Sequence, residues 1–197
     1  MLAIASGKGG SGKTTTTLGL ARAFDGHVLA VDADRDMPNL HAMAGVDRCD
    51  NEDTENPQHP DDPTVSVRSP PSGIDDRAFE EWLRSVAADT HLAVVDCPAG
   101  AGPDAVVPLR VADAVVVVTP LCAPALRDAA KTAAMARALG TPVVGCVVSR
   151  ARVAPDSVAE LVGAPVLGTV PPESSPVLAQ PTVRAAYRRI SDTLGRN

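Results

Sequence analysis

The sequence predicts an α/β fold: a doubly wound, mostly parallel β-sheet with helices on both faces. Short aliphatic runs alternate with helical stretches from one end of the chain to the other, which is typical of this class. The runs are largely continuous in apolar residues, as expected for strands that helices cover on both sides. A glycine-rich segment with the spacing of a phosphate-binding loop lies between the first run and the first helical stretch.

Each expected element follows from one of these patterns. Aliphatic runs bounded by turn residues predict strands at residues 2–5, 28–31, 65–67, 92–95, 114–118, 143–148 and 166–170. Longer stretches between and after them predict helices at residues 13–24, 75–88, 123–139, 156–161 and 183–194. In the last helix, Val183, Tyr187, Ile190 and Leu194 form one apolar stripe. We expect this stripe to pack on the sheet, because so few large apolar residues without Trp or Phe make a weak lipid anchor.

Length and composition indicate one globular domain over residues 1–197. A chain of 197 residues with 45% apolar residues can bury a core without disulfides or metal. Its net charge of −6 argues against a protein whose main role is to coat nucleic acid. No apolar run approaches the roughly 18 residues of a membrane span, and no secretory signal is recognised. The four cysteines are scattered, as in a reducing compartment, so we expect a cytoplasmic protein.

Residues 47–62 depart from the alternating pattern. They hold seven acidic residues and two prolines, with a third proline at residue 63, against one basic residue, Arg48, and they show no apolar period. We expect a mobile acidic surface loop here, either a solvated insertion without a role or a docking site for a partner.

Residues 7–14 match the pattern G-x-x-x-x-G-K-[ST] of a phosphate-binding loop. Glycines let the backbone wrap closely around phosphates, and the following helix adds the positive end of its dipole. In this pattern Lys13 contacts the β- and γ-phosphates, and the Thr14 hydroxyl ligates Mg²⁺. The expected fold is that of a P-loop NTPase, with its ligand beyond the carboxyl ends of the strands. The candidate phosphate-binding residues are Gly7, Lys8, Gly9, Gly10, Ser11, Gly12, Lys13, Thr14 and Thr15.

A second lysine, Lys8, follows the first glycine of the loop. The resulting pattern K-G-G-x-G-K-[ST]-[ST] resembles the deviant phosphate loop of the MinD/ParA superfamily, in particular archaeal-type MinD-like proteins. Residues 31–34 (VDAD) and 38–40 (PNL) resemble the second motif and first switch of that family, and residues 96–100 (DCPAG) resemble its second switch. Residues 114–120 and 170–173 resemble later segments, so the resemblance extends along nearly the whole chain.

The resemblance implies a Mg²⁺-dependent ATPase that works as a homodimer. Lys8 would reach across the dimer to the partner's phosphates, so that ATP, but not ADP, holds two subunits together. Asp34 would orient the attacking water, which makes Lys8 and Asp34 the candidate catalytic residues. Asp32 and Asp96 would lie near the metal with Thr14, Asp96 through a coordinated water.

The candidate base contacts depart from the family pattern. Ser149 and Arg150 follow the strand at residues 143–148, where the family often has an Asn whose amide reads adenine. A hydroxyl makes one bond where an amide makes two, so we expect a weaker preference for ATP over GTP, which competition binding would measure. Pro171, in the segment at residues 170–173, completes this set.

The residues leave three functions open. The leading interpretation is an ATP-driven dimerisation switch that positions machinery for cell division, chromosomes or polar structures, together with an unidentified regulatory or cargo protein. A metallocluster or metal-insertion accessory ATPase is the second, although such relatives generally carry paired cysteines and this sequence has no C-x-x-C motif. A small-molecule kinase or ligase is the third, and Lys8 disfavours it. We expect no autonomous binding to nucleic acid or membrane.

Overall fold

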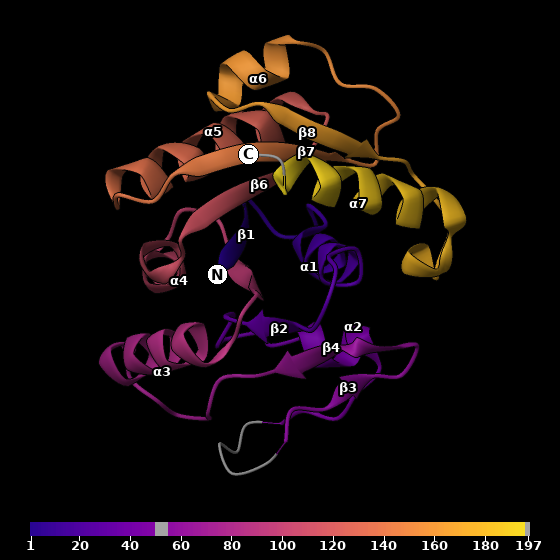
Figure 1. Ribbon diagram of the computed structural model, residues 1–197. Coiled ribbons are helices and arrows are strands. Elements are labelled where there is room, and N and C mark those ends of the chain that lie inside the picture. Colours follow the sequence, from indigo (N-terminus) through magenta and orange to yellow (C-terminus); the bar gives the residue numbers. More distant parts are fainter. Residues whose placement is uncertain (50–54, 196–197) are drawn as a thin grey trace.

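The computed structural model describes residues 1–49 and 55–195. They form an eight-stranded sheet in the order β3-β4-β2-β5-β1-β6-β7-β8, with helices on both faces (Figure 1). Neighbouring strands are parallel except β3 and β4, which pair antiparallel. The predicted fold class is therefore confirmed.

All seven expected strands are present, and most extend beyond the aliphatic run that predicted them. The strands are β1 (Leu2–Ser6), β2 (Val28–Asp32), β3 (Gln58–His59), β4 (Asp62–Arg68), β5 (Ala93–Ala99), β6 (Ala114–Pro120), β7 (Val143–Ser149) and β8 (Val166–Val170). The extensions add polar residues at the carboxyl ends, among them Ser6, Asp32 and Ser149. The candidate site residues therefore lie along the side of the sheet where the carboxyl ends of the parallel strands meet.

The five expected helices are also present. The helices are α1 (Lys13–Ala21), α2 (Leu40–Ala44), α3 (Asp76–Asp89), α4 (Val106–Val111), α5 (Ala123–Ala138), α6 (Ser157–Val162) and α7 (Pro181–Leu194). Helix α1 ends three residues before its predicted end. Helices α2 and α4 are not among the predicted ones, because five or six residues are too few to show a helical period, and Pro108 lies within α4.

The core consists of two layers, one on each face of the sheet. Helices α3, α4, α5 and α6 cover one face, where Phe79 and Leu83 of α3 are fully buried. Helices α1, α2 and α7 cover the other face, and Figure 1 shows the two groups on opposite sides. With only 2% aromatic residues, the core is built mainly from Val, Leu, Ile and Ala, as the composition predicts.

The prediction of a mobile surface loop over residues 47–62 is wrong in part. Gln58–His59 form β3, and β4 begins at Asp62, so this part of the segment adds an antiparallel edge to the sheet. Residue 59 is buried despite its polar neighbours. A two-residue strand depends on its partner strand and has no pattern of its own. Residues 50–54 of the predicted loop lie outside the described residues.

The apolar stripe of α7 packs on the sheet, as predicted. Val183, Tyr187 and Ile190 are buried in the same layer as α1. The Tyr187 hydroxyl forms a 3.2 Å hydrogen bond with Thr16, and a Cβ atom at Gly19 would be 2.3 Å from the Tyr187 ring. Glycine at position 19 thus permits the close approach of the two helices. No helix within the described part of the chain is long and apolar enough to cross a membrane.

Candidate functional site

The loop between β1 and α1 has the backbone shape of a phosphate cradle. Gly10 and Gly12 adopt φ angles of 70° and 93°, the left-handed region that side chains disfavour. Gly7 lies against α5, where a Cβ atom would be 2.3 Å from the carbonyl carbon of Asp128. A Cβ atom at Gly9 or Gly10, by contrast, would meet no atom within 4 Å. The loop is therefore packed tightly on its inner side and open at its mouth.

Hydrogen bonds within the loop hold its carbonyl groups toward the protein. The Ser6 and Ser11 hydroxyls donate to the Lys8 carbonyl oxygen at 3.0 and 2.8 Å. With the carbonyl groups held in this way, backbone N–H groups can face a bound anion. The open mouth, the glycines and the N-terminus of α1 fit the phosphates of a nucleotide.

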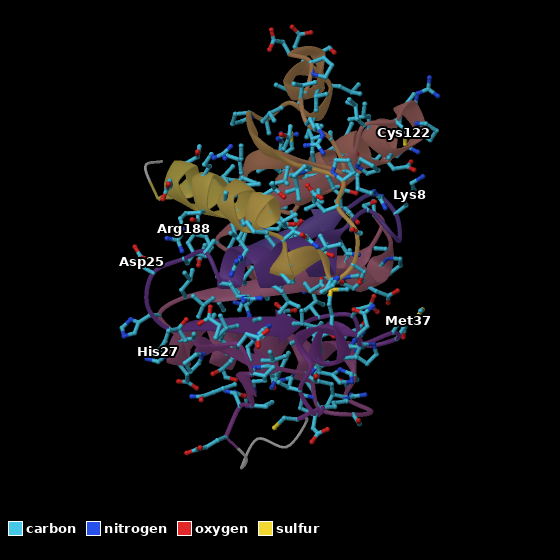
Figure 2. All side chains as sticks on the ribbon, turned by 90° about the vertical axis from the view of Figure 1, so that its right-hand side faces the viewer. Lys8, Asp25, His27, Met37, Cys122 and Arg188 are labelled. Carbon is cyan, nitrogen blue, oxygen red and sulfur yellow. The ribbon has the colours of Figure 1, made fainter. Side chains whose placement is uncertain are left out.

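The two lysines of this loop lie in opposite environments. Lys13 opens α1, is only 9% exposed and lies close enough to Asp96 to favour its ionised form. Lys8 is exposed at the edge of the molecule (Figure 2). Its ammonium has no hydrogen bond or ion pair with any residue in the ranges 1–49 and 55–195. One lysine thus belongs to the cradle, and the other faces away from the protein.

Asp32 organises the segment at residues 34–40, which we call the first switch segment. Its Oδ2 accepts the N–H groups of Asn39 and Leu40, both at 2.9 Å, and its Oδ1 accepts that of Asp34 at 3.0 Å. Asp32 is fully buried. A direct bond from Asp32 to a metal would compete with these hydrogen bonds, so a position near the metal stays a prediction.

Asp96 lies directly opposite Asp32 in the register of β2 and β5. It is 3% exposed, and the Thr17 hydroxyl donates to its Oδ1 at 3.4 Å. Residues 96–100, the second switch segment, begin here. The Gly100 N–H donates to the Ser6 carbonyl oxygen at 2.8 Å, which joins this segment to the end of β1.

Thr14 and Asp34 lie where the phosphate-binding loop meets the first switch segment. The Thr14 hydroxyl donates to Asn39 Oδ1 at 3.3 Å. Asp34 is half-buried, and its Oδ1 accepts the Met37 N–H at 3.0 Å, which closes a turn. Mg²⁺ in nucleotide sites generally takes few protein ligands besides phosphate oxygens and water, so the Thr14 hydroxyl with Asp96 nearby fits that ion. Asn39, the middle residue of the PNL sequence at 38–40, is a further neighbour of the site.

A pocket of about 190 Å³ beside the loop is the candidate base site. Thr15, Val170, Pro171 and Val177 are among its lining residues, and such a mostly apolar lining suits the flat face of a base. Thr15, predicted among the phosphate-binding residues, and Pro171, a predicted base contact, therefore line one pocket.

Ser149 and Arg150 line the same pocket but hold the phosphate loop. The Ser149 hydroxyl donates to the Ser11 carbonyl oxygen at 2.8 Å, and Arg150 Nη2 donates to the Gly10 carbonyl oxygen at 2.7 Å. The Ser149 hydroxyl proton is thus used within the protein, while its oxygen can still accept a hydrogen bond, so a contact between Ser149 and the base stays a prediction. Arg150 adopts a φ angle of 52°, which directs the chain back toward the loop.

The family model of the CobQ/CobB/MinD/ParA nucleotide-binding domain matches residues 2–180 of the chain. The chain belongs to this family. The resemblance to the MinD/ParA superfamily is thereby confirmed, and the matched range includes residues 7–14, which carry the phosphate-loop pattern.

Similar proteins include both uncharacterised and named members. An uncharacterised ATP-binding protein of Methanocaldococcus jannaschii is 30% identical over 200 residues, which cover 86% of this chain and 73% of the relative. The septum site-determining protein MinD of Pyrococcus horikoshii, complexed with Mg-ADP, has a TM-score of 0.82 at 22% identity and covers 98% of this chain and 94% of that chain. MinD in the MinC:MinD complex of Aquifex aeolicus has a TM-score of 0.81 at 18% identity, with 100% and 95% covered. At these identities the structural likeness shows the shared fold.

In this MinD/ParA family member, burial dominates the electrostatics of the two central carboxyls. Burial raises the pKa of Asp96 from 3.8 to about 7, while Lys13 and two threonine hydroxyls act against the rise. Burial also raises the pKa of Asp32, against the three backbone N–H groups that it accepts. The charge of Asp32 adds to the rise of the Asp96 pKa, and the charge of Asp34 adds to the rise of the Asp32 pKa, because negative charges in one site repel each other.

The raised pKa values predict a pH dependence of stability. Between about pH 4 and about pH 7 the folded chain holds the Asp96 proton that the unfolded chain releases. The free energy of unfolding should therefore fall as the pH rises through this range. Denaturant unfolding of the nucleotide-free protein at several pH values measures the slope, and Asp96→Asn should reduce it. An equal slope in the parent and in Asp96→Asn would contradict the assignment.

Proposed function

We propose that this protein is an ATP-dependent dimerisation switch that hydrolyses ATP slowly. The contrast between Lys8 and Lys13 carries the proposal. Lys13 is buried in the cradle, whereas Lys8 is exposed without a partner among the described residues. A second copy of the chain, facing the first, offers the Lys8 ammonium the phosphates of the opposite site. The extra charge of the γ-phosphate then makes the dimer depend on ATP.

Different residues of the chain bind the phosphates, hold the metal ion and orient the attacking water. The glycine loop and the N-terminus of α1 bind the phosphates, and Lys13 neutralises their charge. Mg²⁺, which the Thr14 hydroxyl would hold with Asp96 nearby, supplies further neutralisation of phosphate charge. Asp34 orients the attacking water. Lys8 of the opposite subunit stabilises the charge that develops on the transferred phosphoryl group.

The two switch segments connect hydrolysis to dimerisation. Thr14 is bonded to Asn39 of the first switch segment, and Gly100 of the second is bonded to Ser6 below the loop. The loss of the γ-phosphate changes the charge at the loop. Each switch segment is joined to the loop by one of these hydrogen bonds, so this change can alter the conformation of both segments. A ligand shifts such an equilibrium by the difference between its affinities for the two states, so ATP favours the dimer and ADP the monomer.

The names of similar solved structures support a positioning role in the cell. The solved structures with this fold include MinD proteins of septum site determination, and one of them is complexed with MinC. We propose a comparable role for this chain, with a protein partner that recognises the ATP-bound dimer.

Cys122 provides a native reporter of the proposed dimer. It is exposed, whereas Cys97 and Cys146 are buried. Cys122 and Lys8 follow the carboxyl ends of the paired parallel strands β6 and β1, and Figure 2 shows both on one side of the molecule. A facing subunit that receives Lys8 would therefore also cover Cys122.

Alkylation of Cys122 tests this arrangement in a Cys49→Ser background, which leaves one exposed thiol. We expect Mg²⁺ and ATP to slow alkylation about 10-fold or more relative to Mg²⁺ and ADP, because only the open monomer reacts. Lys8→Ala should remove the protection. Equal alkylation rates with ATP and ADP in the parent would contradict the proposal.

The alternative functions have less support. Relatives that insert metals or carry metal clusters generally have paired cysteines, and this sequence has no C-x-x-C motif. A small-molecule kinase would need a second substrate site, and assays for a phosphorylated product with candidate acceptors would reveal one.

A further inference from the structure

Arg35 follows Asp34 directly in the first switch segment and extends to helix α3. Its Nη1 donates to the Ile74 carbonyl oxygen at 3.1 Å, and its Nη2 forms an ion pair with Asp76. Its guanidinium lies 4.7 Å from the ring centroid of Phe79. The Arg35 side chain is 24% exposed, so these contacts are partly shielded from water. Three contacts of different kinds thus fix one side chain.

The residues of α3 that Arg35 contacts are themselves held in place. Phe79 is fully buried in the core, and Asp75 caps α3 by accepting the Ala78 N–H at 2.8 Å. Asp76 lies in the first turn of α3, where a negative charge is favoured by the helix dipole. An exposed ion pair alone contributes little, but a planar guanidinium held by a carbonyl group, a carboxylate and a ring has one geometry.

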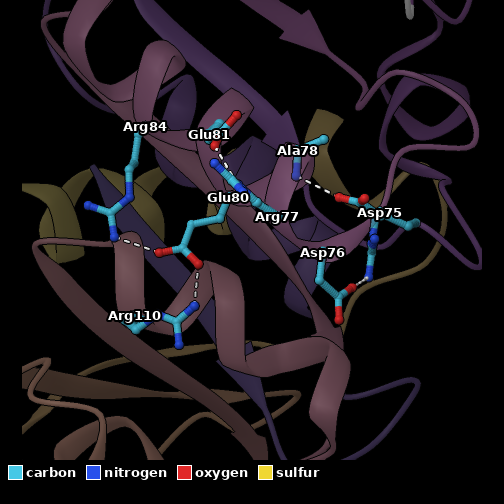
Figure 3. Close-up of polar contacts among 9 residues, drawn as sticks. Asp75, Asp76, Arg77, Ala78, Glu80, Glu81, Arg84 and Arg110 are labelled. Atoms are coloured by element: carbon cyan, nitrogen blue, oxygen red, sulfur yellow. Dashed lines mark hydrogen bonds and ion pairs between the residues drawn. The ribbon is translucent and has the colours of Figure 1, made fainter.

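Helix α3 is itself tied to the second switch region. Glu80 forms ion pairs with Arg84 of the same helix and with Arg110 of α4, as Figure 3 shows. Helix α4 follows the second switch segment after a short 3₁₀ turn at Pro103–Ala105. The start of helix α3 therefore contacts Arg35, through Asp76 and Phe79, and its Glu80 contacts α4.

We propose that Arg35 is a positioning residue that fixes Asp34 for hydrolysis by fastening the first switch segment to α3. The inference rests on the proposed function of Asp34 in orienting the attacking water. Asp34 has two further restraints: its N–H donates to Asp32 Oδ1 at 3.0 Å, and its Oδ1 accepts the Met37 N–H at 3.0 Å within the same turn. Asp32 holds the two ends of the segment through its bonds to Asp34, Asn39 and Leu40, whereas Arg35 holds the part next to Asp34 against α3. Without Arg35 this part can shift, and a displacement of about 1 Å of a reacting group can cost about 100-fold in rate.

Arg35→Ala tests the inference against Arg77→Ala, a matched control. Arg77 lies on the same helix as Asp76, is 88% exposed and pairs only with Glu81 among the described residues. We expect Arg35→Ala to lower the single-turnover rate of ATP hydrolysis by about 10- to 100-fold, with ATP affinity within about 3-fold of the parent. Arg77→Ala should keep the parental rate. Arg35→Lys, which keeps the charge but loses the planar fork, should fall between Arg35→Ala and the parent.

A double variant separates positioning from a general structural role. If Arg35 acts through Asp34, Arg35→Ala should add less than about 2-fold to the loss caused by Asp34→Ala. A further 10-fold loss in the double variant, or a parental rate in Arg35→Ala and Arg35→Lys while Asp34→Ala is slow, would overturn this inference and leave the proposed function standing. A parental rate in Asp34→Ala would overturn the assignment of Asp34 and this inference with it.

Discussion

Lys13→Ala is expected to weaken the binding of both ATP and ADP by at least about 100-fold, because it removes the buried cation of the phosphate cradle. Hydrogen bonds to charged groups contribute about 1.5–3 kcal/mol each, and Lys13 is expected to contact two phosphates. The loss should be large for ADP as well, since the β-phosphate is present in both nucleotides. Calorimetric titration with each nucleotide measures it.

Lys131→Ala is the matched control for this variant. Lys131 lies on α5, is 73% exposed and pairs with Asp128 at 3.2 Å. Its replacement removes the same charge and should leave the affinity for both nucleotides unchanged. Dissociation constants for Lys13→Ala that stay within about 3-fold of the parent would show that Lys13 is not the phosphate cation.

Asp34→Ala is expected to slow ATP hydrolysis by about 100-fold or more while ATP still binds, as when a group that positions water is lost. Asp34 lies outside the phosphate cradle, and its carboxyl contacts the backbone of its own turn. The variant should therefore accumulate as the ATP-bound dimer. Single-turnover hydrolysis and nucleotide affinity, measured on the same preparation, check both parts.

Asp34→Asn separates the catalytic role from the closure of the turn. The amide oxygen of Asn can still accept the Met37 N–H, so the turn is kept while the negative charge is lost. We expect hydrolysis to be slow in Asp34→Asn as well. A parental rate in Asp34→Asn, combined with a slow Asp34→Ala, would mean that residue 34 only shapes the turn.

The elements that could be predicted from the sequence are those whose signal is local and long. The short valine-rich run of β6 indicates a buried strand by its length and composition, and the stripe of α7 indicates a helix by its period. The carboxyl half of β5 contains Asp96 and Pro98, which are typical of loops, so its last residues were beyond prediction. Strand β3 and helix α2 are too short to show a period and form because neighbouring elements pack on them.

The same distinction applies to the candidate site. Lys13 and Thr14 could be predicted because their chemistry lies within one contiguous loop. The bonds from Ser149 to Ser11 and from Arg150 to Gly10 join residues about 140 positions apart and depend on the placement of β7 beside the loop. The role of Arg35 depends in the same way on where α3 begins. Contacts of this kind follow from the packed fold and not from a motif.

The mass of the protein in solution tests the central claim most directly. Light scattering should give one chain of 20.2 kDa with Mg²⁺ and ADP, and twice that mass with Mg²⁺ and ATP, measured in Asp34→Ala so that ATP persists. Adding Lys8→Ala should leave ATP affinity nearly intact and return the mass to that of one chain. A dimer that forms equally well without Lys8, or a parent that stays monomeric with ATP, would contradict the account.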